Sequence, residues 1–380
     1  GLPPRQHYNE VNMIFQILIG IIIILPICVL LYMKLPQFGA KVTKARIREF
    51  EASPQFKKGR FRNYEFTRAD MSFSKLPKLM QQSLFSGVEK VPNRKLPQMQ
   101  RDKRDFVGVP DDSFRMTWFG HSAYLLEIDG KKILLDPMLG PAASPVFFAV
   151  KRFNQTLPLS AEDLPELDAV IFTHDHYDHL DYSTILKIKD KVSHFYTPLG
   201  VGDHLIKWGV SPERITQLDW WQDARIAHLT LVCTPTQHFS GRTFADRDRT
   251  LWSSWVLQSK DKNLFFNGDS GYFRGFKEIG DRFGPFDVCY MECGQYHYMW
   301  KENHMVPEET AQAFLDLQGK QLIPVHWGSF TLAPHDWYDP IERLSKICDS
   351  SGIHLVTPKI GETIDFNDRM VSVAWWKENM

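Results

Sequence analysis

The stretch THDHYDH at residues 173–179 decides how this chain is interpreted. It follows an apolar run at 167–172, LDAVIF, whose length and β-branched content are typical of a buried strand, and it precedes a helix-like segment at 182–188. Its polar side chains therefore lie on the loop that leaves a strand. Neutral imidazole and carboxylate groups are ligands for divalent ions such as zinc. The stretch predicts a metal site, and the alternative is a solvated loop that happens to be rich in histidine. The candidate ligands are His174, His176, Asp178 and His179.

Three later residues of the same types also follow apolar runs. A predicted strand at 229–235 precedes His238, another at 263–267 precedes Asp269, and a third at 321–325 precedes His326. Because the same ligand types recur just past strand ends, we expect them to meet at one site.

Other segments are predicted from the same periodicity. Strands are expected at 116–122, 123–128, 132–137, 194–197, 215–218, 252–258 and 286–291, and helices at 73–85, 200–208 and from Pro307 onward. Asp129 and Gly130 form the expected turn of a hairpin between 123–128 and 132–137. His121 is expected to be structural, bonded within a turn next to Gly120, and outside the site.

Length and composition favour one large α/β or β-rich domain with an appendage. The chain has 380 residues, of which 43 % are hydrophobic, enough for a sizeable core. Its 45 basic and 45 acidic residues cancel, so the overall charge does not indicate nucleic-acid binding. The five cysteines contain no pair at two-residue metal-binding spacing, and we expect reduced, buried thiols in a cytosolic compartment.

Residues 13–33, MIFQILIGIIIILPICVLLYM, carry no charge. A helix of this length rises about 30 Å, which matches the hydrocarbon thickness of a bilayer. A core helix should show a polar face, and a secretory signal should have a basic start and a small-residue cleavage site; neither feature is found. The run predicts a transmembrane helix.

Basic residues follow this helix. Residues 34–62 hold nine lysines and arginines, whereas Arg5 is the only lysine or arginine before the run. The positive-inside bias places the long C-terminal part on the cytoplasmic side, next to anionic headgroups. A plain solvated face is the competing explanation for these charges. Because the chain opens with Gly1, its natural start is undefined.

The whole pattern resembles the metallo-β-lactamase-fold hydrolases. The family signature H-x-H-x-D-H is found at residues 174–179, with GDSG at 268–271 and PVHWGSF at 324–330. Within that family the segments TWFGHS, ILLDP, LDWWQ, FFNGDSGY, FGPFD and HMVPEE look most like the N-acyl-phosphatidylethanolamine-hydrolysing phospholipase D group and its bacterial relatives. One stretch, ECGQY at 292–296, is more polar than the apolar-Gly-Ala-Tyr stretch of that phospholipase.

The resemblance implies an α/β (α+β) fold, the αββα four-layer sandwich, preceded by a transmembrane helix. The expected parts are a tail at 1–12, the helix at 13–33, a basic juxtamembrane segment and N-terminal extension at 34–110, and the hydrolase domain at 111–380. It also implies two zinc ions, although another divalent metal is compatible with the same ligands. One ion would take His174, His176 and His238; the other would take Asp178, His179 and His326, with Asp269 bridging them.

The implied activity is a phosphodiesterase of phospholipase D type at a membrane, releasing N-acylethanolamine and phosphatidic acid from N-acyl-phosphatidylethanolamine. Two cations lower the pKa of a shared water and polarise a substrate oxygen, and Asp178 is placed to receive the water's proton. His304 is the candidate donor to the leaving group, unless it caps the helix from Pro307. Tyr296, Trp300 and Trp221 could line the substrate groove, although aromatic residues are more often core.

Two other functions fit the same residues. A lactonase or other ester hydrolase of this fold would use the same ligands, because fold and metal do not fix the substrate. A non-catalytic, metal-binding envelope protein is the second alternative. Acyl preference and oligomeric state are not encoded in any motif.

Overall fold

The computed structural model describes residues 4–65, 77, 81, 87–368 and 372–380. The chain divides into two compact units, Gly1–Phe38 and Gly39–Met380. The helix predicted at 73–85 falls almost entirely outside the described residues. Residues 39–65 and 87–110 belong to the same compact unit as the rest of the chain up to Met380.

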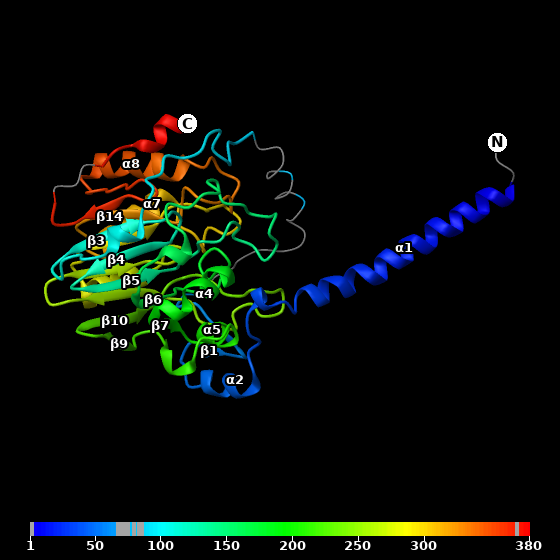
Figure 1. Cartoon of the computed structure of the whole chain (residues 1–380), viewed down its shortest axis with the longest axis horizontal. Coiled ribbons are helices and arrows are strands. Elements are labelled where there is room, and N and C mark those ends of the chain that lie inside the picture. Colours follow the sequence, from blue (N-terminus) through cyan, green and yellow to red (C-terminus); the bar gives the residue numbers. More distant parts are fainter. Residues whose placement is uncertain (1–3, 66–76, 78–80, 82–86, 369–371) are drawn as a thin grey trace. The chain divides into compact units, whose positions relative to one another are not determined.

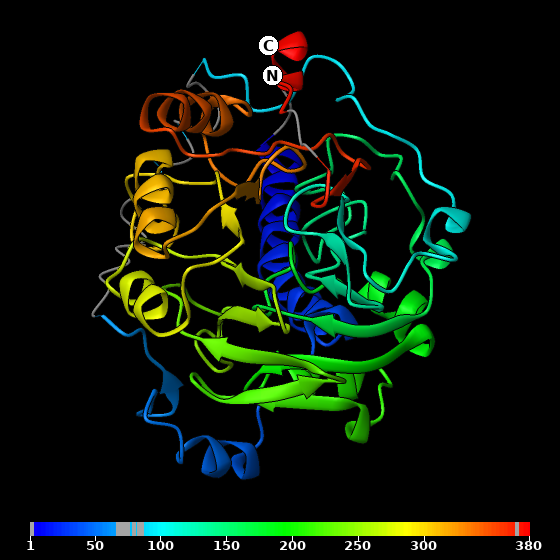
Figure 2. The same cartoon turned by 90° about the vertical axis from the view of Figure 1, so that its left-hand side faces the viewer.

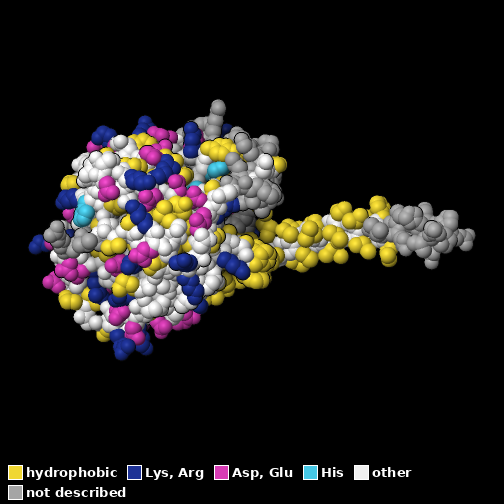
Figure 3. Space-filling model, turned by 90° about the horizontal axis from the view of Figure 1, so that it is seen from above, with side chains coloured by type: hydrophobic (Ala, Val, Ile, Leu, Met, Phe, Trp, Pro, Cys, Tyr) yellow, Lys and Arg dark blue, Asp and Glu magenta, His cyan; other side chains and the backbone are white. Residues whose placement is uncertain are grey.

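The first unit is one long helix, α1 (Pro4–Tyr32), followed by a 3-10 turn at Pro36–Phe38. Its segment Phe15–Tyr32 has a mean hydropathy of 2.7, and none of that segment is buried. Hydrophobic side chains cover the part of α1 whose atoms are coloured in Figure 3. The predicted apolar helix is therefore present, with the length and composition that crossing a membrane requires.

The second unit contains two large sheets (Figure 1). Seven strands form one sheet in the order β15-β3-β4-β5-β6-β7-β8, and six form the other in the order β14-β13-β12-β11-β10-β9. The strands of the first sheet are β3 (Phe114–Trp118), β4 (Tyr124–Ile128), β5 (Lys131–Leu135), β6 (Leu167–Ile171), β7 (Val192–Pro198), β8 (Ile215–Leu218) and β15 (Thr363–Asp365). Those of the second are β9 (Asp223–Ile226), β10 (Leu229–Thr234), β11 (Ser254–Gln258), β12 (Asn263–Phe266), β13 (Val288–Glu292) and β14 (Leu322–Val325).

Helices cover the outer face of each sheet, which gives the four-layer αββα sandwich (Figure 2). The helices on the seven-stranded sheet are α4 (Tyr182–Ile188) and α5 (Gly202–Lys207), and those on the six-stranded sheet are α6 (Gly275–Phe283), α7 (Pro307–Asp316) and α8 (Asp339–Ser351). Side chains alternate along the strands as this arrangement requires: Leu125 faces the α4 and α5 side, whereas Tyr124 and Leu126 face the other sheet. Tyr124 stacks on Tyr290 of the six-stranded sheet at 4.6 Å. The predicted fold class is confirmed.

The segment after Gly39 packs onto this sandwich. It forms α2 (Lys44–Phe50) and the short pair β1 (Phe56–Lys57) and β2 (Arg60–Phe61). The rings of Phe50, Phe56 and Phe61 contact one another at 4.9–5.6 Å and are buried in the main core. This aromatic cluster fixes the segment to the second unit.

The expected hairpin between β4 and β5 is present. Its turn residues Asp129 and Gly130 have φ of +48° and +71°, the left-handed pair that a two-residue turn of this type requires. The strands pair antiparallel, with Leu126 opposite Ile133. Strands β1, β2, β9 and β15 and helices α2, α6 and α8 were not predicted.

Strand direction brings the polar loops together. β5, β6, β7 and β8 run parallel, as do β12, β13 and β14. The carboxyl ends of parallel strands lie at one edge of a sheet, so the residues that follow β5, β6, β12, β13 and β14 all emerge at corresponding edges.

Candidate metal centre

Two clusters of metal-binding side chains meet at this edge, and a third group, Asp269, Glu292, His304 and His326, overlaps them. The first contains His174, His176, His238 and Asp269, and the second contains His121, Asp178, His179 and His326. Within each cluster the candidate ligand atoms all lie within 4.8 Å of one another. The structure therefore brings together the seven ligands predicted from the sequence, and it adds His121.

Three ring nitrogens converge in the first cluster. Nδ1 of His176 lies 2.9 Å from Nε2 of His174 and 3.2 Å from Nε2 of His238. Burial lowers the pKa of His174 and His238 well below the ordinary value, so both rings are neutral and keep a lone pair. A cation between the three nitrogens explains why they face one another, since neutral rings cannot all donate hydrogen bonds there.

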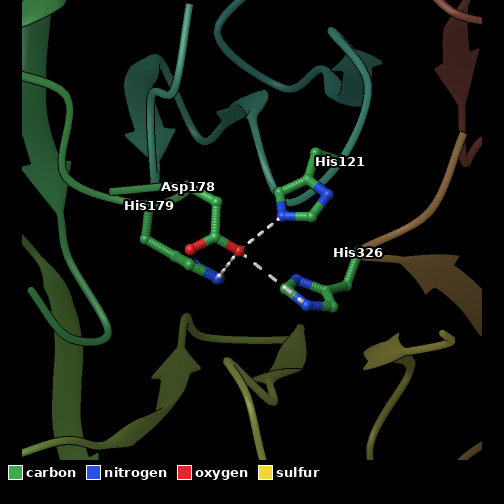
Figure 4. Close-up of side chains that lie close together, drawn as sticks. All are labelled: His121, Asp178, His179 and His326. Carbon is green, nitrogen blue, oxygen red and sulfur yellow. Dashed lines mark hydrogen bonds and ion pairs between the residues drawn. The ribbon is translucent and has the colours of Figure 1, made fainter. Parts of the chain in front are cut away.

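The Asp178 carboxylate is the hub of the second cluster (Figure 4). Its Oδ2 lies 2.9 Å from Nε2 of His121, 3.4 Å from Nε2 of His179 and 3.9 Å from Nε2 of His326. His121 and His326 are also linked through their backbones, because the N–H of His326 donates to the carbonyl of His121. Both residues have left-handed backbones, with φ of +53° and +67°, a strained conformation that structures retain at functional sites.

Asp269 faces both clusters. Its Oδ1 lies 3.2 Å from Nε2 of His179 and 3.1 Å from Nδ1 of His326. Its Oδ2 lies 3.7 Å from Nε2 of His174 and 3.6 Å from Nε2 of His238. This is the arrangement that a bridging carboxylate requires.

Unpartnered atoms test whether the site fits cations. Nε2 of His179, Nε2 of His326 and Oδ1 of Asp269 are buried and have no hydrogen-bond partner among the described residues. Burial raises the pKa of Asp269 to about 6, a cost that nearby positive charge removes. Imidazole and carboxylate are the donor set of borderline divalent ions. The residues present therefore fit two divalent cations.

Outer hydrogen bonds orient these ligands. Oδ2 of Asp136, directly after β5, lies 2.8 Å from Nδ1 of His179, and Nδ1 of His238 lies 3.0 Å from the carbonyl oxygen of Asn303. The Asp175 carboxylate, between two predicted ligands, accepts from the hydroxyl of Thr250 at 2.7 Å. The first two bonds fix the ring orientation and tautomer of His179 and His238, and the third holds the loop between His174 and His176.

His304 lies beside both clusters. Its ring centroid is 5.0 Å from that of His238 and 5.3 Å from that of His326. Its Nδ1 is 3.1 Å from Oε2 of Glu292, a fully buried carboxylate that also accepts from the backbone N–H groups of Met305 and Ser270. Glu292 therefore holds one nitrogen of His304 and leaves Nε2 for another partner.

A cavity of about 300 Å³ opens next to His304. Its wall is mostly apolar, with Phe239, Trp300 and Leu332 among the lining residues. Gln295 shapes this wall, because its Oε1 accepts from the N–H groups of Leu332 and Ala333 at 2.8 and 3.1 Å. The polar stretch 292–296, which departs from the phospholipase pattern, thus positions both His304 and one wall of the cavity.

Two of the predicted substrate contacts lie elsewhere. Trp300 lines the cavity, but the hydroxyl of Tyr296 bonds to Asp339 of α8. The indole of Trp221 lies under the guanidinium of Arg282 of α6, 4.0 Å away. Both rings are held by partners on the outer helices, where they pack as structural aromatics.

Sequence reasoning placed His121 outside the site, and the structure corrects this. The backbone of the turn after β3 brings its ring to Asp178. The predicted strand at 116–122 included His121, but β3 ends at Trp118, so His121 lies just past a strand, as His238 and His326 do. Glu292, the last residue of β13, was not predicted to orient His304, although it directly follows the predicted strand at 286–291.

Comparisons with known proteins agree with this geometry. The family described as "Beta-lactamase superfamily domain" matches residues 131–327. An uncharacterised protein of Mycobacterium tuberculosis is 42 % identical over 266 residues, covering 69 % of this chain and 71 % of that protein. The N-acyl-phosphatidylethanolamine-hydrolyzing phospholipase D 1 of Caenorhabditis elegans is 30 % identical over 270 residues, covering 67 % and 76 %.

Among solved structures, the metallo hydrolase Igni18 of the archaeon Ignicoccus hospitalis has the same fold, with a TM-score of 0.51 and 22 % identity over 68 % of this chain and all of that one. The chain belongs to the beta-lactamase superfamily and is a metallo-hydrolase of that fold.

Proposed function

We propose that this protein is a zinc-dependent phosphodiesterase of phospholipase D type that cleaves N-acyl-phosphatidylethanolamine into N-acylethanolamine and phosphatidic acid. The observation that supports it best is the apolar cavity beside His304, which gives an acyl-bearing leaving group a place next to the two metal-binding clusters. The resemblance to the phospholipase of Caenorhabditis elegans points to the same substrate class.

The reaction requires one bond to form and one to break. A water oxygen bonds to phosphorus while the bond from phosphorus to the ethanolamide oxygen breaks, and the water's proton passes to Asp178. When bound, divalent cations at the two clusters supply Lewis acidity, which lowers the pKa of water and offsets charge on the phosphoryl oxygens. The residues that would hold them are His174, His176, His238, Asp178, His179, His326 and Asp269.

His304 then protonates the departing alkoxide. An alkoxide is a poor leaving group, so a positioned acid contributes about 10²- to 10⁴-fold in rate. Glu292 bonds Nδ1 of His304 and so directs Nε2 as the donor. Burial raises the pKa of Glu292 and lowers that of His304, so the pair is neutral and Glu292 carries a proton. That proton passes to Nδ1 of His304 as Nε2 gives its own proton to the alkoxide.

The test uses the full chain in detergent micelles with N-acyl-phosphatidylethanolamine, and free N-acylethanolamine is measured by mass spectrometry. His304→Gln should lose activity on this lipid but keep turnover of a bis-nitrophenyl phosphodiester, whose leaving group needs no acid. Glu292→Gln should show the same split to a smaller degree. Turnover of a lactone with no N-acylethanolamine released would favour the ester hydrolase instead.

We also propose that α1 spans a membrane and that the catalytic unit lies on its cytoplasmic side. The apolar segment Phe15–Tyr32 and the basic residues after it support this topology. A tether raises the effective concentration of a substrate that stays in the bilayer. Protease treatment of sealed cells tests the topology. A tag after Met380 should be protected until the membrane is opened. Digestion of the tag in intact cells would place the catalytic unit on the opposite side.

A further inference from the structure

Three phenylalanines of the catalytic unit are exposed to solvent. Phe147 is 79 % exposed, Phe148 65 % and Phe244 98 %. Every other phenylalanine that the structure describes between Gly39 and Met380 is buried or half-buried. Large exposed aromatic side chains that gather in one place mark a surface that contacts something apolar.

Phe147 and Phe148 lie at the tip of a hairpin-like loop, 141–152. The loop is closed by a backbone bond from the N–H of Ala143 to the carbonyl of Val150. Below the tip, Ala143 and Val150 pack with Phe330 and Leu332. Since Leu332 lines the cavity beside His304, this loop supports one wall of that cavity.

Phe244 lies at the tip of the loop 239–250. Two backbone N–H groups, of Arg242 and Thr243, donate to Oδ1 of Asp246 and tighten the turn that presents Phe244. The same loop contributes Phe239 and Arg247 to the wall of the cavity. All three exposed phenylalanines therefore lie on loops that build the cavity or support its wall.

We propose that Phe147, Phe148 and Phe244 form an aromatic rim that inserts into the surface of a lipid bilayer and places the cavity mouth on it. The rim would be a contact with the membrane separate from α1. The assignment of a lipid bilayer as the partner of the rim rests on the proposed function, because a phospholipid substrate must enter the apolar cavity directly from the bilayer. Moving an exposed aromatic side chain from water into the membrane interface lowers the free energy, because its apolar surface leaves water.

Charge near the rim agrees with a lipid partner. Lys151 lies beside the tip that carries Phe147 and Phe148, and residues 141–152 contain no acidic side chain. Lys301 lies next to Trp300 of the cavity wall. Both lysines are exposed, so they can contact anionic headgroups while the phenylalanines enter the apolar layer.

Fluorescent labels on the full chain test the insertion. In a Cys28→Ser background the remaining cysteines are buried, so a thiol-reactive label attaches only at an added cysteine. Phe148→Cys and Phe244→Cys report on the rim. Leu315→Cys, on an exposed site of α7, is the matched control.

Each labelled protein is placed in bilayers of phosphatidylcholine and phosphatidylglycerol that contain acyl chains carrying a nitroxide quencher. We expect severalfold quenching at positions 148 and 244 and none at 315. Quenching at neither rim position would overturn the proposal. A bismaleimide that joins two copies through position 148 in these bilayers would show that a second copy covers the rim, and would also overturn it.

A kinetic arm separates this proposal from the proposed function. Replacing Phe147, Phe148 and Phe244 together by serine should lower turnover of lipid in vesicles about tenfold or more, with unchanged turnover of a soluble phosphodiester. Equal turnover on vesicles would overturn a role for the rim. The label measurement requires no turnover, so it gives an answer even if the lipid substrate is different.

Discussion

Oδ2 of Asp136 lies 2.8 Å from Nδ1 of His179, and the same oxygen accepts a hydrogen bond from the hydroxyl of Thr173 at 2.7 Å. A residue directly after β5 thus orients a ring that belongs to the loop after β6. The carboxylate leaves Nε2 of His179 directed at Asp178 and Asp269. Such an outer carboxylate makes the ring a better ligand.

Asp136→Asn should therefore weaken binding of one of the two cations. Loss of an outer hydrogen bond of this kind lowers metal affinity by about 10- to 100-fold. Competition with a coloured chelator measures the affinity. Asp168→Asn is the control, because Asp168 bonds to Lys131 and the N–H of Lys132 rather than to a ligand. Equal affinities in the two variants would contradict the role given to Asp136.

The number of metal ions that remain bound after single ligands are replaced should show that the site holds two ions and that one carboxylate binds both. His238 contacts only the first cluster, so His238→Ala should release about one metal per chain and leave the second site filled. Asp269 faces both clusters, so Asp269→Ala should weaken both. Elemental analysis after dialysis measures metal per chain. Loss of a single ion in Asp269→Ala would argue against bridging.

The metal ligands were predictable because the residues next to each one in the sequence were enough to identify it. A short apolar run ends in a residue type that binds metal, and strand ends converge at one edge of a sheet. The same logic applied to His121, but its place in a tight turn suggested a local bond. The left-handed backbone that sends its ring to Asp178 depends on contacts with the turn at His326, and such contacts cannot be inferred from neighbouring residues.

Other elements were missed for different reasons. Strand β9 has only four residues, of which Ile226 alone is buried, so its sequence, DARI, offers too short an alternation to predict a strand. Helix α8 does carry a hydrophobic pattern that could have been used: Ile341, Leu344 and Cys348 recur at helical spacing, and all three are buried. The partners of Trp221 and Tyr296 lie more than 40 residues away, and an aromatic residue looks the same in a core as in a groove.

The free energy of unfolding should decrease as the pH falls, and His335 should contribute to this decrease. Its Nε2 accepts from the N–H of Gln295 at 2.9 Å, so the ring is neutral in the folded state. Burial lowers the pKa of His335 below its ordinary value of 6.5. The unfolded chain therefore binds a proton first, and this residue's contribution is full above pH 6.5 and is lost as the pH falls towards the folded-state pKa.

Urea unfolding of the wild type and His335→Gln between pH 7.5 and 5 isolates this effect, because metal release affects both proteins alike. The variant should be less stable at pH 7.5. The difference in free energy of unfolding should shrink below pH 6.5 by at most about 1.4 kcal/mol per pH unit. A difference that stays constant across the range would show that His335 does not titrate as described.

Gly271 should not tolerate a side chain, because the chain passes close to it. A Cβ there would lie 2.1 Å from the carbonyl oxygen of Glu302, a backbone atom that cannot rotate away. Glu302 is followed by Asn303, whose carbonyl oxygen bonds to Nδ1 of His238, and by His304. A shift of this segment would therefore disturb one metal ligand and the proposed acid together.

Gly271→Ala should lower both the metal affinity and the rate on the lipid substrate, and destabilise the fold by roughly 1–3 kcal/mol, the range for an overpacked site. Gly352→Ala provides the comparison. Gly352 has φ +67° and no atom within 4 Å of a Cβ, so its variant suffers backbone strain without displacement. If the two variants bind metal and turn over substrate equally, the approach of Glu302 to Gly271 is not what positions His304. If only Gly271→Ala is impaired, the placement of the acid depends on this glycine.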